Sequence, residues 1–274
     1  MLDMTNCEHI IDQLEETIHN PRKMREGDEL LVGVDLGTAY IVIVVLDQDK
    51  KPVACEMEFA QVLKDGLVVD YVGAMQVVRK LKDKIEQKIG IKLTKAAIAV
   101  PPGTSDRDSK THMYVVEGAG LEVTKILDEP TAANSVLNIK NGVIVDIGGG
   151  TTGLSIIKDQ QVVYVADEAT GGTHLTLVVA GHYKIKFEEA EIVKTDLSKQ
   201  QEVFSMVTPV IEKIATIINN HIRSHEVKAI YLVGGTSCLK KIENVIENVT
   251  GIKTIKPKNP FLVTPLGIAM NCKA

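Results

Sequence analysis

Two segments of the sequence repeat the same short pattern, and this repeat limits the folds that the chain can adopt. Residues 32–38 read Val-Gly-Val-Asp-Leu-Gly-Thr, and residues 143–151 read Val-Ile-Val-Asp-Ile-Gly-Gly-Gly-Thr. Each is an apolar strand that ends in a carboxylate, a glycine-containing turn and a hydroxyl, and each is followed by another apolar run. Glycine lets backbone N–H groups approach an anion closely, and turn amides form nests for phosphate. The repeat therefore predicts two related halves with a nucleotide phosphate chain between them.

Asp35 and Asp146 stand at the roots of the two turns. A carboxylate in that position can hold the water shell of a magnesium ion, which resists dehydration. The alternative is that each carboxylate only accepts hydrogen bonds from its own turn, a common role of aspartate. Because glycine and threonine follow both residues, we favour the magnesium interpretation, with the metal held by Asp35 and Asp146 through water.

Two more segments complete an ordered set of motifs. Residues 128–133 read Asp-Glu-Pro-Thr-Ala-Ala, and residues 230–237 form an apolar strand that ends in Gly-Gly-Thr-Ser. The order DLGT, EPTAA, DIGGGTT, GGTS resembles the actin-like ATPase superfamily, which includes DnaK-type chaperones, actin, bacterial actins and sugar kinases. The resemblance implies an α/β, two-lobed actin-like ATPase fold: duplicated mixed-sheet domains with a nucleotide cleft between them. It also implies ATP or ADP with Mg²⁺ as cofactors.

The resemblance carries over to single positions. Glu129 matches the acidic residue that orients attacking water, and it joins Asp35 and Asp146 as a candidate catalytic residue for slow, magnesium-dependent ATP hydrolysis. Its other interpretation is a carboxylate that favours the positive end of a helix. The residues expected to line the nucleotide are Gly37, Thr38, Ala39, Gly148, Gly149, Gly150, Thr151, Gly171, Gly172, Thr173, Gly234, Gly235, Thr236 and Ser237.

The match is less complete around the base. DnaK-type chaperones place an arginine that stacks on adenine where this chain has Cys238. Their basic residues on the preceding helix have no counterpart, since Ala215, Thr216 and Asn219 occupy the approximate region. Residues 64–70 instead resemble the KDG segment of bacterial actins. The resemblance therefore supports the phosphate loops more fully than the base-binding part.

Strands that alternate with helices predict an α/β fold with mostly parallel pairing. We expect an N-terminal helix and linker over residues 1–28, a first lobe over 29–141 completed by 259–274, and a second lobe over 142–258. The helix expected over 2–20 carries an apolar stripe of Cys7, Ile10, Ile11, Leu14 and Ile18. This stripe packs on its own lobe or enters the groove of a partner; the sequence leaves both interpretations open.

Composition excludes several classes of protein. A formal net charge of −5 argues against nucleic acid as the main partner. No apolar run approaches the length of a membrane span, and the acidic N-terminal segment is not typical of a signal peptide. The cysteines Cys7, Cys55, Cys238 and Cys272 show no paired spacing, which favours reduced thiols in a cytoplasmic protein.

Three features together resemble the ethanolamine utilisation protein J (EutJ) family: the short insertion in the first lobe, the helical insertion in the second, and the extra N-terminal helix. Residues 182–194 also share in this resemblance. It implies a bacterial, cytoplasmic, chaperone-like protein whose partners are ethanolamine-pathway or microcompartment proteins. An actin-like filament, a non-hydrolysing scaffold and a small-molecule kinase remain as alternatives.

Overall fold

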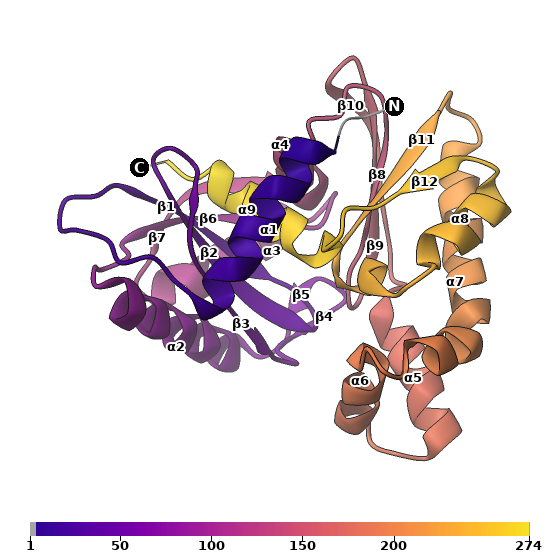
Figure 1. Cartoon of the computed structure of the whole chain (residues 1–274), viewed down its shortest axis with the longest axis horizontal. Helices are drawn as coiled ribbons and strands as arrows, with labels where there is room; N and C mark the ends of the chain where they lie inside the picture. The colour runs from indigo at the N-terminus through magenta and orange to yellow at the C-terminus, as the bar shows by residue number, and fades with distance from the viewer. Residues whose placement is uncertain (1–3, 274) are drawn as a thin grey trace. The chain divides into compact units, whose positions relative to one another are not determined.

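The computed structural model describes residues 4–273, which divide into two compact units. Unit 1 contains the described residues up to Ile139 together with those from Leu262 onward, and unit 2 is Lys140–Phe261. The colours of Figure 1 follow this path, because the chain returns to unit 1 only at the yellow helix α9.

Unit 1 is a mixed sheet with helices on both faces. Its strands are β1 (Leu30–Leu36), β2 (Tyr40–Asp47), β3 (Pro52–Phe59), β4 (Leu63–Lys64), β5 (Leu67–Val68), β6 (Lys95–Val100) and β7 (Glu122–Asp128). Its helices are α1 (Thr5–His19), α2 (Tyr71–Ile89), α3 (Asp106–Gly118), α4 (Glu129–Leu137) and α9 (Val263–Met270). The main sheet has the order β3-β2-β1-β6-β7, while β4 and β5 form a small hairpin.

The sequence of β1 explains how the two faces of this sheet are covered. Val32 and Val34 enter one hydrophobic core together with apolar residues of α2 and α3. Gly33 points the other way, toward α9, where a methyl group would overlap the backbone nitrogen of Ala269. Glycine in the middle of an apolar strand therefore marks the place where α9 lies directly on the sheet.

Helices α4 and α9 pack closely and run in the same direction. A methyl group on Gly267 would overlap the carbonyl oxygen of Ala132, so only hydrogen fits at that crossing. One turn further along, Asn271 Nδ2 donates to Ser135 Oγ at 2.7 Å. Gly267 lies beside Ala132 and Asn271 lies beside Ser135, so the residue numbers increase in the same direction along both helices, which are therefore parallel.

The N-terminal helix is part of unit 1, since α1 contacts β3 and α9. Cys7, Ile11 and Leu14 are buried as expected, but Ile10 and Ile18 are only half-buried. Thr17 takes the predicted place of Ile18, with its hydroxyl donating to Leu14 O at 2.7 Å. The predicted first residue, Leu2, lies outside the described residues. The buried stripe supports packing on the helix's own lobe over docking in a partner's groove.

Unit 2 repeats the strand arrangement of unit 1. Its strands are β8 (Gly142–Ile147), β9 (Thr152–Lys158), β10 (Gln161–Glu168), β11 (Ala229–Val233) and β12 (Lys253–Ile255), in the order β10-β9-β8-β11-β12. Its helices are α5 (Gly172–Tyr183), α6 (Phe187–Thr195), α7 (Gln200–Ile222) and α8 (Ile242–Thr250), with short 3₁₀ turns η1 (Gly235–Cys238) and η2 (Pro260–Leu262). Helices α5 to α8 share one hydrophobic core with β8, β9 and β11.

Both sheets mix strand directions in the same way. The hairpins β1–β2–β3 and β8–β9–β10 are antiparallel, and the crossovers β1–β6–β7 and β8–β11–β12 are parallel. The expectation of mostly parallel pairing is therefore wrong, because each lobe begins with a meander. Within residues 4–273, no helix is long and apolar enough to cross a membrane.

Candidate nucleotide site

The second Asp-Gly hairpin is built as the sequence predicts. Strand β8 brings Asp146 to its carboxyl end, and the turn closes with Gly148 N donating to Thr151 O at 2.9 Å. Asp146 is buried, and it lies opposite Val233 of the neighbouring parallel strand β11. The carboxyl ends of β8 and β11 therefore meet at one edge of the sheet.

Two other predicted loops of unit 2 converge on this turn. The carbonyl oxygen of Gly148 accepts from Gly172 N at 2.9 Å and from Thr236 Oγ1 at 2.8 Å. The next carbonyl, of Gly149, accepts from Thr173 N at 2.7 Å. Segments far apart in the sequence are thus held together by hydrogen bonds to two successive glycines.

The glycines in these loops leave no space for side chains. A methyl group on Gly171 would stand 2.8 Å from Gly148 O and 2.9 Å from Gly149 O. Gly234 has φ +87°, and its methyl group would overlap Asp146 Oδ1. The loops therefore pack so closely against one another that only glycine fits at these positions.

A buried ion pair lies beside the same turn, and sequence analysis did not single it out. Lys194 Nζ contacts Glu191 Oε2 at 2.6 Å, Thr176 Oγ1 at 2.9 Å and Gly172 O at 3.4 Å. Burial lowers the pKa of Lys194, while Glu191 opposes this shift. In the sequence alone, the charged residues of α6 are typical of a helix face that is exposed to solvent. The signal that could have revealed them is the spacing of Glu191 and Lys194, which puts both on the same face as the buried Ala190.

Other residues of unit 2 near this region have different surroundings. Thr151 and Thr236 are buried, and Ser237 donates to Val233 O at 2.7 Å, which fixes the start of η1. His174 receives a hydrogen bond from Gly171 N at 3.5 Å, in keeping with a structural role in the turn. Ala215 is fully buried in the core, so it cannot contact a ligand.

Unit 1 holds the other predicted residues. In the β1–β2 hairpin, Gly37 N donates to Tyr40 O at 3.0 Å and Ala60 N donates to Ala39 O at 3.0 Å. Thr38 lies between them, in the turn that follows Asp35. Because β1 and β7 both run parallel to β6, Asp35 and Glu129 stand at the same edge of the unit 1 sheet.

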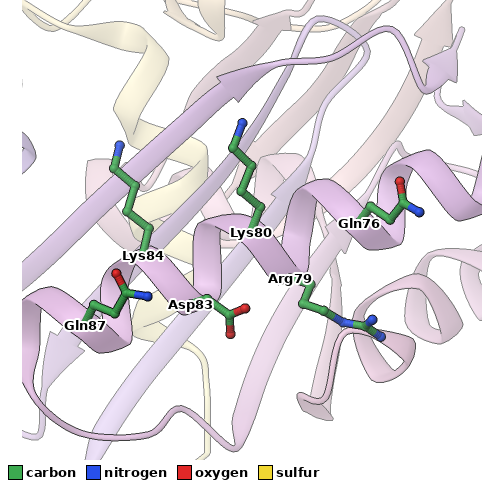
Figure 2. A pocket seen from close by; sticks show the side chains of 6 residues that line it. All are labelled: Gln76, Arg79, Lys80, Asp83, Lys84 and Gln87. Atoms are coloured by element: carbon green, nitrogen blue, oxygen red, sulfur yellow. The ribbon is translucent and has the colours of Figure 1, made fainter.

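A surface hollow of unit 1 involves none of the predicted site residues. It runs along the outside of α2, has a volume of about 540 Å³, and is lined by the side chains labelled in Figure 2. Lys80 and Lys84 form ion pairs at 2.6 Å with Glu58 and Glu56, and Arg79 donates to Gly118 O at 2.7 Å. Since its cations are already engaged, this hollow is not a candidate binding site.

Comparisons with known proteins show the family of the chain. The family model described as Type IV pilus assembly protein PilM matches residues 111–269. The ethanolamine utilization protein EutJ of Salmonella typhimurium is 42% identical over 246 residues, which cover 89% of this chain and 86% of that protein. The chain belongs to the EutJ family.

Solved structures establish the fold of this family. The crystal structure of EutJ from Carboxydothermus hydrogenoformans is 47% identical, has a TM-score of 0.90, and matches 96% of this chain and 97% of that one. MreB5 of Spiroplasma citri bound to ADP has a TM-score of 0.70 over 88% of this chain and 95% of its own, at 16% identity, which shows the fold alone. The EutJ-family chain therefore has the predicted actin-like ATPase fold.

A more distant similarity extends to chaperones. Chaperone protein DnaK of Mycoplasmopsis pulmonis is 23% identical over 88% of this chain, and the match covers 58% of the DnaK sequence. The chain is thus an ethanolamine-utilisation relative of actin-like and DnaK-type proteins.

Proposed function

We propose that this EutJ-family chain is a chaperone-like protein that binds ATP and ADP with Mg²⁺ and hydrolyses ATP slowly. The observation that carries the proposal is the junction at Gly148 and Gly149, where three motif loops of unit 2 are joined by hydrogen bonds. Such a junction holds turn amides and the start of α5 in fixed positions. The amides of a glycine-rich turn such as Gly148 to Thr151 can form a nest for phosphate.

Different segments of the chain would contact different parts of the nucleotide. The turn from Gly148 to Thr151 would hold phosphate oxygens. The N–H groups of Gly172 and Thr173 already donate to Gly148 O and Gly149 O, so the segment from Gly171 to Thr173 would line the phosphate site and hold this turn in place. Lys194 supports that segment through Gly172 O. Gly234 to Ser237 would face the nucleoside. In unit 1, Gly37, Thr38 and Ala39 would complete the phosphate contacts.

Magnesium fits this donor set. No group of three or more His, Cys, Asp or Glu that could hold a metal occurs among residues 4–273. Asp35 and Asp146 are single carboxylates at turns, and Mg²⁺ usually keeps several waters and is held by one or two carboxylates plus phosphate oxygens. When bound, the ion neutralises charge that develops on the phosphates.

The biological role follows from family membership. We propose that the chain acts in the bacterial cytoplasm and assists the assembly or maintenance of ethanolamine-pathway enzymes or microcompartment proteins. Because Cys7, Ile11 and Leu14 are buried in unit 1, α1 does not offer its apolar stripe to these partners. Clients would contact other surfaces of the two units.

Nucleotide binding is tested by isothermal titration calorimetry with ADP and MgCl₂. Asp146→Asn keeps the size of the side chain and removes its charge. A charge-assisted contact contributes about 1.5–3 kcal/mol, so we expect affinity to fall about 10- to 150-fold. Asp159→Asn is the matched control, since Asp159 is exposed in the β9–β10 turn, and it should bind like the wild type. Equal affinity in all three proteins would remove Asp146 from the site.

Sedimentation distinguishes the proposed chaperone-like protein from the alternative, an actin-like filament. A polymer depends on protein concentration and on a head-to-tail contact, so an actin-like filament should pellet above a critical concentration when nucleotide is present. A chaperone-like protein should stay in the supernatant at the same concentrations. Pelleting that requires nucleotide would replace the chaperone proposal with the filament.

A further inference from the structure

A lysine just beyond β12 holds the backbone of the loop that is proposed to face the nucleoside. Lys256 Nζ donates to Ser237 O at 3.0 Å and to Leu239 O at 2.8 Å. It also forms an ion pair with Glu243 Oε2 at 2.9 Å. An ammonium group carries three N–H donors and no acceptor, so it can gather three oxygens around it. Lys256 therefore ties this loop to β12 and to the first turn of α8.

The sheet of unit 2 explains why Lys256 reaches this loop. Strand β12 runs parallel to β11, and β11 runs parallel to β8. The segments that follow these three strands therefore lie at one edge of the sheet, and Lys256 directly follows β12. Its side chain is mostly buried there, which keeps water away from its contacts.

The two carbonyls that Lys256 holds stand on either side of Cys238. The ends of the same loop are fixed by uncharged contacts: Gly234 N donates to Pro260 O at 3.0 Å, and Lys240 N donates to Gln200 Oε1 at 3.1 Å. Between these ends, a charged donor holds the backbone. Hydrogen bonds from a charged donor are about twice as strong as neutral ones.

A loop that is fixed before its ligand arrives avoids the entropy cost of becoming ordered on binding. This matters for the nucleoside, because Cys238 supplies no positive charge and no planar group for a base. Affinity for the nucleoside would then depend on how firmly the backbone of the loop is held.

We propose that Lys256 is a positioning residue that fixes the Gly234–Cys238 loop for the nucleoside part of the ligand. The inference rests on the proposed nucleotide binding, and it concerns the nucleoside alone. The turn from Gly148 to Thr151 keeps its hydrogen bonds from Gly172 N and Thr173 N when Lys256 is removed. Phosphate binding should therefore not depend on Lys256.

The test separates the nucleoside from the phosphates. Calorimetry on the full chain compares Mg-ADP with magnesium tripolyphosphate, which has no nucleoside, in the wild type and in Lys256→Met. Methionine keeps the apolar stem and removes the donors. Affinity for Mg-ADP should fall about 5- to 30-fold, the equivalent of about 1–2 kcal/mol, which is the cost of ordering the backbone of one residue. Affinity for tripolyphosphate should change by less than about 2-fold.

Two further variants make the comparison sharper. Lys253→Met is the matched control, because Lys253 lies on the same strand, is exposed and pairs with Glu247 at 3.4 Å; it should bind both ligands like the wild type. Glu243→Gln is milder than Lys256→Met, since it removes only the charge beside Lys256. It should weaken Mg-ADP binding by a smaller factor and leave tripolyphosphate binding unchanged, so the proposal stays testable even when Lys256→Met does not fold.

Cys238 gives a second readout in the wild type. Cys238 is exposed, whereas Cys7, Cys55 and Cys272 are buried, so N-ethylmaleimide should modify Cys238 first in the folded chain. Saturating Mg-ADP should slow this modification, because the nucleoside lies against the loop. Saturating magnesium tripolyphosphate should leave the rate unchanged.

The contrary outcomes are distinct. Equal losses for Mg-ADP and tripolyphosphate in Lys256→Met would make Lys256 a structural residue of unit 2. Unchanged Mg-ADP affinity in folded Lys256→Met would show that the loop needs no charge to hold it, which overturns the inference. If bound Mg-ADP does not protect Cys238, or if the wild type binds both ligands equally well, the inference fails while phosphate binding stands. If the wild type binds neither ligand, the proposed function fails and the inference with it.

Discussion

Two neighbouring carboxylates at the start of α4 have different tasks. Asp128 is the N-cap: its oxygens accept from Thr131 N at 2.9 Å and from Thr131 Oγ1 at 2.7 Å. Glu129 is the first residue of the helix and is half-buried. Since Asp128 already satisfies the helix start, Glu129 is not required as a cap. The cap of α4 therefore belongs to Asp128, and the role of Glu129 in orienting water stays a proposal.

Glu129→Gln tests this role in a steady-state ATPase assay. The amide keeps the size of the carboxylate but loses its charge, and groups that act in proton transfer or water positioning contribute about 10²–10⁴-fold. Turnover should fall by that factor while ADP affinity is retained. Glu122→Gln, at the exposed opposite end of β7, is the matched control and should hydrolyse ATP at the wild-type rate. Unchanged turnover in Glu129→Gln would assign Glu129 to the helix start.

Candidate site residues that belong to a contiguous motif could be predicted from the sequence. Residues that join the site only because the fold buries them there could not be predicted. Asp146 and its glycines are recognisable because a strand, a carboxylate and a tight turn are contiguous in the sequence. Glu191 and Lys194 escaped notice because charged residues usually face water, and only the fold shows that α6 turns them toward Gly172.

At the scale of elements, the parallel pair α4 and α9 is the contact that most depends on a single residue. Gly267 allows the two backbones to touch, because any larger residue would overlap Ala132 O. The structure places Gly267 against Ala132 of α4. The partner could not be read from the sequence, since α4 and α9 are separated by all of unit 2.

Two glycine substitutions of the same kind should have opposite effects. Gly267→Ala forces α4 and α9 apart, and overpacking of this type costs about 1–3 kcal/mol. Gly181 lies inside α5 with nothing near its missing side chain, so Gly181→Ala should raise stability by about 0.5–1 kcal/mol. Urea unfolding monitored by circular dichroism would measure both. A neutral Gly267→Ala would show that the helices can separate without loss.

At the scale of the whole molecule, the order of motifs along the chain is enough to predict a duplicated fold. Both sheets have the same order and the same mixture of directions, because each lobe starts with an Asp-Gly hairpin. The overall alternation of strands and helices wrongly suggested that most neighbouring strands are parallel. This pattern does not distinguish an antiparallel meander from a parallel crossover. Hairpins are local, and crossovers depend on contacts made only after the chain has folded.

The parallel packing of α4 and α9 also has a consequence for protein engineering. Unit 2 is a cassette inserted between residues 139 and 262, and its two junctions lie at opposite ends of this helix pair. A helix of this length spans about 13 Å, so a gene without the cassette needs a linker of at least about four extended residues. Unit 1 made in this way should unfold in one cooperative thermal transition by circular dichroism. A shorter linker would pull α4 out of line with α9 and broaden that transition, while the excised cassette should melt on its own.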